Sequence, residues 1–237
     1  TPDFTVCAGN AISLKTEKYE EYVWSGTAVT KGLLNSTIIQ TPEFLDHATA
    51  DTYTVRVDVK DINGCEGFAE KTIVVNPIPS TSLSALEQVF CVDVDAAEII
   101  TAKISPEAVQ GTGTWTGVGL ESQANTTVGF NPNVAKATAS PHTITYNFIS
   151  DANCAAEPST IQMTVNPLPI VSISPSRVDA CKSGNNSEII TITPTGTTST
   201  GTLRYSSTTA TIDLSSGELD PTANSVGKHT IRLDYED

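Results

Sequence analysis

Cysteines are the residues of this chain whose type and spacing predict chemistry most clearly. Five occur, at positions 7, 65, 91, 154 and 181, and none belongs to a CxxC pair. Such wide spacing is typical of disulfide bonds, whereas zinc sites need closely spaced ligand pairs. The first four occupy repeated positions, so we predict the disulfides Cys7–Cys65 and Cys91–Cys154. Cys181 is predicted to be unpaired, with a reactive thiol as the alternative. Disulfides indicate an oxidising compartment and hence a secreted or surface protein.

Calcium binding is the second kind of chemistry that the sequence raises. Short-range groups of acidic and amide side chains occur twice, at Asp58, Asp61 and Asn63 and at Asp93 and Asp95. An EF-hand needs ligands at alternate positions and a glutamate at position 12, but Lys60 interrupts the first group and Ala69 occupies position 12. We therefore predict solvated, turn-forming carboxylates, with a weak calcium site as the alternative. No metal or cofactor ligand is assigned.

The sequence has no pattern that predicts catalysis. Its three histidines, His47, His142 and His229, are scattered, and no serine lies in a Gly-x-Ser-x-Gly elbow. Residues 111–119 are rich in glycine, but a phosphate loop would need a lysine or a GxGxxG register before a helix. A strand followed by a turn is predicted there instead. We expect no catalytic residue, no cofactor and no enzyme activity.

Internal repetition defines the domains that position these residues. Val75-Asn76-Pro77-Ile78-Pro79 returns as Val165-Asn166-Pro167-Leu168-Pro169 about 90 residues later, and each copy closes a segment that contains two cysteines. We therefore expect small domains at residues 1–79, 80–169 and 170–237, joined by proline-containing linkers. The third unit stops inside the strand that precedes the second cysteine of the others, so it is expected to be truncated at its C-terminus.

Alternating hydrophobicity predicts strands throughout the chain. In residues 53–59 the odd positions are apolar and the even positions polar, which is typical of a strand with one buried face. Residues 144–148, 161–165, 189–192 and 231–233 alternate similarly, and helical spacing is nearly absent. Many short strands between Gly, Pro and Asn turns predict an all-β fold of tandem β-sandwich domains. The proline-containing joints favour an extended rod.

Two tryptophans, Trp24 and Trp115, each lie between the two cysteines of a unit. We predict that they fill the space between sheets, with an exposed sugar-stacking platform as the alternative. The third unit carries Leu203 at the corresponding position, a change that a core position tolerates.

The charge balance excludes one class of partner. The chain has 27 acidic and 13 basic residues and a net charge of −14, whereas binding to nucleic acid needs clustered Lys and Arg. No apolar run approaches the roughly 18 residues of a membrane span, and the first four residues are no signal peptide. We expect a soluble, monomeric piece of a longer protein with no nucleic-acid partner.

Several segments of the first unit resemble the Ig-like and PKD-like repeats of large Bacteroidetes cell-surface proteins. They are Cys7-Ala8-Gly9-Asn10, Tyr22-Val23-Trp24-Ser25-Gly26, Tyr53-Thr54-Val55 and Asp61-Ile62-Asn63-Gly64-Cys65. The second unit resembles the longer repeats of giant gliding-motility adhesins of the SprB type. It does so through Phe90-Cys91, Gly111-Thr112-Gly113-Thr114-Trp115, Gly117-Val118-Gly119, Phe130-Asn131-Pro132 and Asn153-Cys154. The departures are Asn153-Cys154 without an intervening glycine, and Leu203 in place of tryptophan.

This resemblance implies an extracellular, cell-surface location, export by the type IX secretion system, and a role as stalk or adhesin. We therefore expect a non-catalytic stalk or adhesive segment of a secreted bacterial adhesin of gliding motility. Its expected partners are neighbouring repeat domains of the same chain and a surface polysaccharide or other cell-surface component. The alternative is a carbohydrate-binding or spacer module of a secreted hydrolase. Carbohydrate binding would need exposed aromatic clusters, and aromatic residues are only 6% of the chain.

Overall fold

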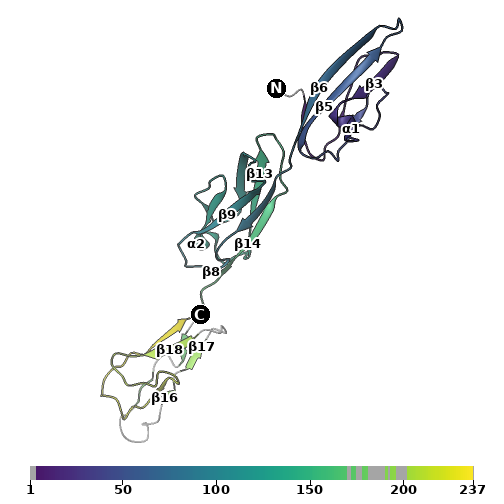
Figure 1. Cartoon of the computed structure of the whole chain (residues 1–237). Helices are drawn as coiled ribbons and strands as arrows, with labels where there is room; N and C mark the ends of the chain where they lie inside the picture. Colours follow the sequence, from purple (N-terminus) through teal and green to yellow (C-terminus); the bar gives the residue numbers. More distant parts are fainter. Residues whose placement is uncertain are drawn as a thin grey trace. The chain divides into compact units, whose positions relative to one another are not determined.

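The computed structural model describes residues 4–169, 172–174, 178–180, 190–191, 193–195 and 202–236. The chain divides into two compact units, Thr1–Pro167 and Leu168–Asp237 (Figure 1). The first unit contains two hydrophobic cores, one within residues 14–75 and one within residues 90–165. The predicted boundary at residue 79 therefore falls between two separate cores of one unit. The predicted boundary at residue 169 lies close to the division between the units.

The first sandwich is built on a four-stranded sheet in the order β1-β6-β5-β3. Its strands are β1 (Phe4–Cys7), β3 (Glu21–Ser25), β5 (Asp51–Lys60) and β6 (Glu66–Asn76). β5 and β6 form a long antiparallel hairpin, whereas β1 lies parallel to the last residues of β6. The other layer contains β2 (Ile12–Ser13), β4 (Glu43–Phe44) and the one-turn helix α1 (Thr27–Thr30).

Alternation along β5 decides which face of this sheet is buried. Tyr53, Val55 and Val57 are buried, as their period of two predicts, and they pack against Phe44 of the other layer. Trp24 is only 6% exposed, and its indole N–H donates to the carbonyl oxygen of Ile39 at 2.8 Å. The prediction that this tryptophan fills the core is confirmed.

The second sandwich has two four-stranded sheets. One, in the order β10-β13-β14-β8, consists of β8 (Val89–Cys91), β10 (Gly111–Thr116), β13 (His142–Ser150) and β14 (Ser159–Asn166). The other, in the order β11-β12-β9-β7, consists of β7 (Ser80–Ser84), β9 (Glu98–Ser105), β11 (Leu120–Glu121) and β12 (Thr127–Phe130). The short helix α2 (Pro132–Ala135) follows β12.

The core of the second sandwich lies between its two sheets. Trp115 is 5% exposed, its ring centroid lies 4.5 Å from that of Tyr146, and its indole N–H donates to the carbonyl oxygen of Ala124 at 3.0 Å. This tryptophan therefore also fills the core, as predicted. A side chain at position 113 would collide with the Tyr146 hydroxyl and with the backbone of Asn125, so only glycine fits there. The glycine-rich segment is the predicted strand, β10, followed by a turn.

The described residues of the second unit form three two-stranded sheets. They pair β15 (Ser172–Ser174) with β17 (Thr193–Thr195), β16 (Ile190–Thr191) with β19 (Glu218–Leu219), and β18 (Thr202–Ser206) with β20 (Arg232–Glu236). Tyr205 and Ile212 are buried, and Leu219, Ile231 and Leu233 pack against them.

The β10–β13 pair recurs in the second unit as β18–β20, with a register shifted by two residues relative to the repeated His142 and His229. Trp115 of β10 lies opposite Tyr146 of β13, and Leu203 of β18, one repeat later, lies opposite Tyr235 of β20. The chain is thus all-β and built from Ig-like β-sandwich domains, as the sequence predicts. The rod arrangement stays a prediction.

Candidate functional site

The thiols of Cys7 and Cys154 are joined in a disulfide bond. Their Cα atoms lie 5.7 Å apart, although their sequence separation is 147. Cys7 is the last residue of β1 in the first sandwich, and Cys154 lies between β13 and β14 of the second, where it is 1% exposed. The bond therefore ties one sandwich to the next.

The predicted disulfides Cys7–Cys65 and Cys91–Cys154 are wrong. Cys7 and Cys154 bond to each other, and Cys65 and Cys91 are both free and exposed. Cys181 lies outside the described residues, so its unpaired state stays a prediction.

Parallel pairing of the first and last strands explains why a bond within one sandwich cannot form. Cys7 lies opposite Asn76 at the end of β6, whereas Cys65 immediately precedes the start of β6. The 11 residues of β6, at about 3.3 Å each, separate these two cysteines by roughly 36 Å. A disulfide needs Cα atoms within about 7 Å. Cys91 and Cys154 are separated in the same way by β14.

The bridge crosses the proline-containing joint that connects the two sandwiches. Asn76 and Pro77, at the exit of the first sandwich, line a hollow of about 330 Å³ together with Val109, Gln110 and Asp151 of the second. The backbone N–H of Asp151 donates to the carbonyl oxygen of Gln110 at 2.9 Å, which holds the turn before Cys154 against the preceding loop. The joint thus combines a covalent link with an ordered turn.

The turns that carry Cys65 and Cys154 have the same structure. Gly64 has φ of 81° and Asn153 has φ of 62°, so both adopt the left-handed conformation. The backbone N–H of Cys65 donates to Oδ1 of Asp61 at 2.8 Å, and that of Cys154 donates to Oγ of Ser150 at 3.0 Å. Asn153 therefore stands where Gly64 stands, and the missing glycine is a replacement by asparagine rather than a deletion.

The acidic residues considered as calcium ligands are used in other ways. Asp58 accepts hydrogen bonds from Arg56, with Nη2 to Oδ1 at 2.6 Å, and this contact lowers the pKa of Asp58. Asp61 accepts hydrogen bonds from the backbone N–H groups of Cys65 and Asn63. These bonds lower the pKa of Asp61, and the bond from Cys65 has the largest effect. The described residues contain no group of three or more side chains of the kind that binds metal ions. These carboxylates form turns and pairs.

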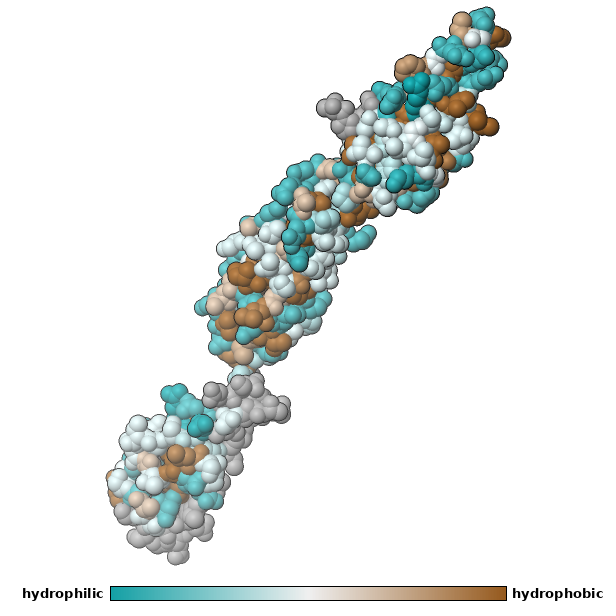
Figure 2. Space-filling model, in the orientation of Figure 1, coloured by the Kyte–Doolittle hydropathy of each residue, from teal (hydrophilic) through white to brown (hydrophobic). Residues whose placement is uncertain are grey.

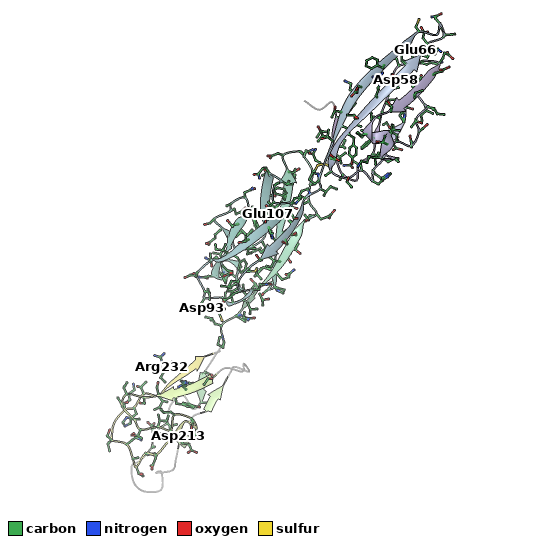
Figure 3. The ribbon with its side chains drawn as sticks, viewed as in Figure 1. Asp58, Glu66, Asp93, Glu107, Asp213 and Arg232 are labelled. Carbon is green, nitrogen blue, oxygen red and sulfur yellow. A yellow bond between two sulfur atoms is a disulfide. The ribbon has the colours of Figure 1, made fainter. Side chains whose placement is uncertain are left out.

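The second acidic pair lies in the other sandwich. The side chain of Asp95 accepts a hydrogen bond from the side chain of Asn133 at the start of α2. Asp93 and Asp95 do not belong to a group of three or more potential metal ligands among the described residues. Asp93 is labelled at the end of the sandwich that carries Cys91 (Figure 3). Both residues are solvated, in agreement with the predicted role.

The outer face of the first sandwich carries an open groove of about 450 Å³. Val23, Asp58 and Phe68 lie opposite one another across β3, β5 and β6. The Arg56 guanidinium carbon lies 4.0 Å from the centroid of the Phe68 ring, which is 65% exposed. Asp58 and Glu66 are labelled on this hairpin in Figure 3. Hydrophobic residues on the visible surface otherwise form separate patches among hydrophilic ones (Figure 2).

The histidines occupy structural positions. His142 is buried, and its Nε2 lies 2.7 Å from the carbonyl oxygen of Lys136. His229 makes the corresponding contact with the carbonyl oxygen of Ser225 at 2.8 Å. His47 lies beside Asp46 on the surface of the first sandwich. His47 and His142 thus belong to different sandwiches of the first unit, and His229 belongs to the second unit.

Comparisons with known proteins report similar architecture only. No protein-family model and no curated protein matches the chain. Among solved structures, a protocadherin gammaB7 EC3-6 cis-dimer is 12% identical, with a TM-score of 0.42, over 93% of this chain and 63% of that one. Clostridium thermocellum CbhA fibronectin(III)-like modules are 15% identical, with a TM-score of 0.35, over 70% of this chain and 94% of theirs. Murine CEACAM1b is 11% identical, with a TM-score of 0.36, over 70% of this chain and 96% of that one. The chain spans less than two thirds of the protocadherin fragments.

Both described helices have only four residues. The part of the chain that the structure describes contains no helix that is long and apolar enough to cross a membrane.

Proposed function

We propose that this chain is a non-catalytic stalk or adhesive segment of a secreted bacterial cell-surface adhesin, of the kind used in gliding motility, and that it carries mechanical tension. The observation that carries the proposal is the disulfide between Cys7 and Cys154, which crosses the joint between two sandwiches. A bond across a joint contributes little to a single binding site. It matters for a chain whose domains must stay together while its ends are pulled apart.

The path of an applied force follows from this bond. Tension that enters ahead of Cys7 passes through the two sulfur atoms to Cys154 and continues into β14. Residues 8–153 lie in the covalent loop, so they cannot be drawn out while the disulfide is intact. The buried core of the first sandwich lies inside this loop, as does most of the second core, whose Ala156, Met163 and Val165 lie outside it. The loop therefore limits how far the chain lengthens under load.

Location and arrangement are part of the same proposal. Disulfides persist in oxidising compartments, which supports a protein outside the cell, at the cell surface. The Asn-Pro-Ile-Pro and Asn-Pro-Leu-Pro joints restrict the backbone and favour an extended array of three domains. Neighbouring repeats are the first partners of each domain, and a surface polysaccharide or other surface component is the proposed adhesive partner.

Cyclic loading of single molecules tests the mechanical role. The chain is tethered by its two ends and stretched repeatedly, first under oxidising conditions and then with a thiol reductant. We expect the first unit to keep its length over many oxidised cycles and to lengthen after reduction. If the oxidised and reduced chains lengthen equally, the disulfide bears no load and the proposal is wrong.

A further inference from the structure

The two free cysteines occupy the same structural positions as the two bonded ones. Cys7 lies opposite Asn76 in the parallel pairing of β1 with β6, and Cys91 lies opposite Asn166 in the parallel pairing of β8 with β14. The residue after each cysteine donates its backbone N–H to the carbonyl oxygen of that same asparagine, at 2.8 Å in the first sandwich and 3.0 Å in the second. Cys91 is therefore to the second sandwich what Cys7 is to the first.

Cys65 and Cys154 are equivalent in the same sense. Each follows a residue in the left-handed conformation, Gly64 or Asn153, at the end of the turn of a long hairpin. In each turn the residue four positions earlier donates its backbone N–H to the carbonyl oxygen of the cysteine at 3.0 Å. The hairpin cysteine thus lies at one end of a sandwich, and the cysteine beside the Asn-Pro exit lies at the other.

Burial differs between bonded and free members of these pairs. Cys154 is 1% exposed beside the first sandwich, whereas its equivalent, Cys65, is exposed. Cys7 is half-buried, whereas Cys91 is exposed. The turn and strand that hold each thiol are the same, so the difference comes from the presence or absence of a neighbouring sandwich.

From this equivalence we propose that Cys65 and Cys91 are each half of a disulfide to an adjacent repeat domain. The exit cysteine of one repeat bonds to the hairpin cysteine of the next repeat. Cys91 then forms a disulfide with the hairpin cysteine of a repeat that follows its Asn-Pro exit. Cys65 forms a disulfide with the exit cysteine of a repeat that precedes its own. The proposal concerns the assembly of repeats and does not depend on an adhesive role.

The chemistry is a thiol–disulfide exchange with a disulfide oxidant such as oxidised glutathione. The thiolate of one cysteine attacks the oxidant and releases one reduced glutathione as a mixed disulfide forms. The second cysteine then attacks this mixed disulfide and releases the other reduced glutathione. Two protein thiols lose two electrons and two protons, and the oxidant gains them.

Duplication of residues 80–169 within the full chain tests the proposal. A second copy placed after Pro169 recreates the native joint, because Asn166-Pro167-Leu168-Pro169 is then followed by Ser80, as Asn76-Pro77-Ile78-Pro79 is. Cys181→Ser is introduced in every version. After refolding with oxidised and reduced glutathione and alkylation, intact mass counts the cysteines held in protein disulfides.

The parent chain should hold two cysteines in a disulfide, Cys7 and Cys154. The duplicated chain should hold four, because Cys91 of the first copy bonds to Cys154 of the second. Cys91→Ser in the first copy should return the count to two, whereas Cys91→Ser in the second copy should leave it at four. A count of two in the duplicated chain, or equal counts for both substitutions, contradicts the proposal. Circular dichroism of each version checks that the added copy is folded.

A loop exchange tests the part played by Cys65. In the second copy, residues 150–154 are replaced by residues 61–65, Asp-Ile-Asn-Gly-Cys. If the turn of residues 61–65 can supply one cysteine of such a disulfide, the count stays at four. A count of two, with four retained in the version that keeps residues 150–154, contradicts the role proposed for Cys65.

Discussion

Cys7 lies opposite Asn76 in the parallel pairing of β1 with β6, which places its thiol at the exit of the first sandwich. The turn of the second sandwich that holds Cys154 approaches the same joint, and the two sulfur atoms are bonded there. The connection between sandwiches is therefore set by strand topology. A first strand that paired with the other end of β6 would have brought Cys7 toward Cys65 instead.

Loss of the bridge should destabilise the first unit. The chain-entropy model of disulfides gives about 5 kcal/mol for a loop of this length, shared here between two sandwiches. We expect Cys7→Ser with Cys154→Ser to lower the thermal midpoint clearly. Cys65→Ser with Cys91→Ser is the matched control and should change the free energy of unfolding by less than about 0.5 kcal/mol. Equal effects of the two double variants in calorimetry would contradict the observed pairing.

The equivalence of Gly64 and Asn153 predicts an asymmetry among substitutions at position 64. The φ of 81° suits glycine and asparagine and disfavours β-branched residues. Space is not limiting, because a Cβ at this position would meet only Cε of Lys60 at 3.7 Å. Gly64→Asn should lower the free energy of unfolding by only a few tenths of a kcal/mol, and Gly64→Val by more than about 1 kcal/mol. Urea unfolding measures both, and similar losses would contradict the assigned conformation.

Strand pattern and repetition predict most of the fold, because alternation along residues 53–59 and 144–148 encodes which face is buried. Burial of Trp24 and Trp115 follows from the same reasoning. The disulfide could not be predicted, since the sequence does not reveal that β1 pairs with β6 in parallel. Cysteines that recur in each repeat are equally compatible with bonds inside a repeat and between repeats. Orientation of the outer strands decides between them.

The Arg56–Phe68 contact was also missed by sequence reasoning. The two residues lie in different strands, and only the register of β5 and β6 brings them together. Alternation does place Arg56 on the outer face, but it does not identify its aromatic partner.

Acid should weaken the turn at Asp213 in the second unit. Its Oδ1 accepts hydrogen bonds from Ser215 Oγ at 2.7 Å and from the backbone N–H of Ser216 at 2.7 Å, and these bonds lower the pKa of Asp213 well below its usual value (labelled in Figure 3). Because the folded-state pKa is lowered, the ionised carboxylate stabilises the fold at pH values above the unfolded-state pKa of about 3.9. This stabilisation is lost as the pH falls toward the folded-state pKa. A carboxyl ¹³C titration should still show Asp213 ionised near pH 3. An unshifted titration would contradict these hydrogen bonds.

An extended array predicts a large radius of gyration. A compact globule of 237 residues would have a value of about 18 Å. We expect small-angle scattering of the full chain to give a clearly larger value, because proline joints keep neighbouring domains from folding back. Pro167→Gly with Pro169→Gly should broaden the distance distribution without unfolding either neighbour. A value near 18 Å for the unaltered chain would exclude the rod.

Single-molecule extension measures the central claim most directly, because the contour length reports which residues the disulfide encloses. With a sequence separation of 147 between the bonded cysteines, at about 3.4 Å per residue, reduction should release roughly 500 Å of additional length on complete unfolding. The chain with Cys65→Ser and Cys91→Ser should show the same gain, and the chain with Cys7→Ser and Cys154→Ser should show none. If the Cys65→Ser, Cys91→Ser chain loses the gain, the bonds lie within the sandwiches, and the proposed load path through Cys7 and Cys154 is wrong.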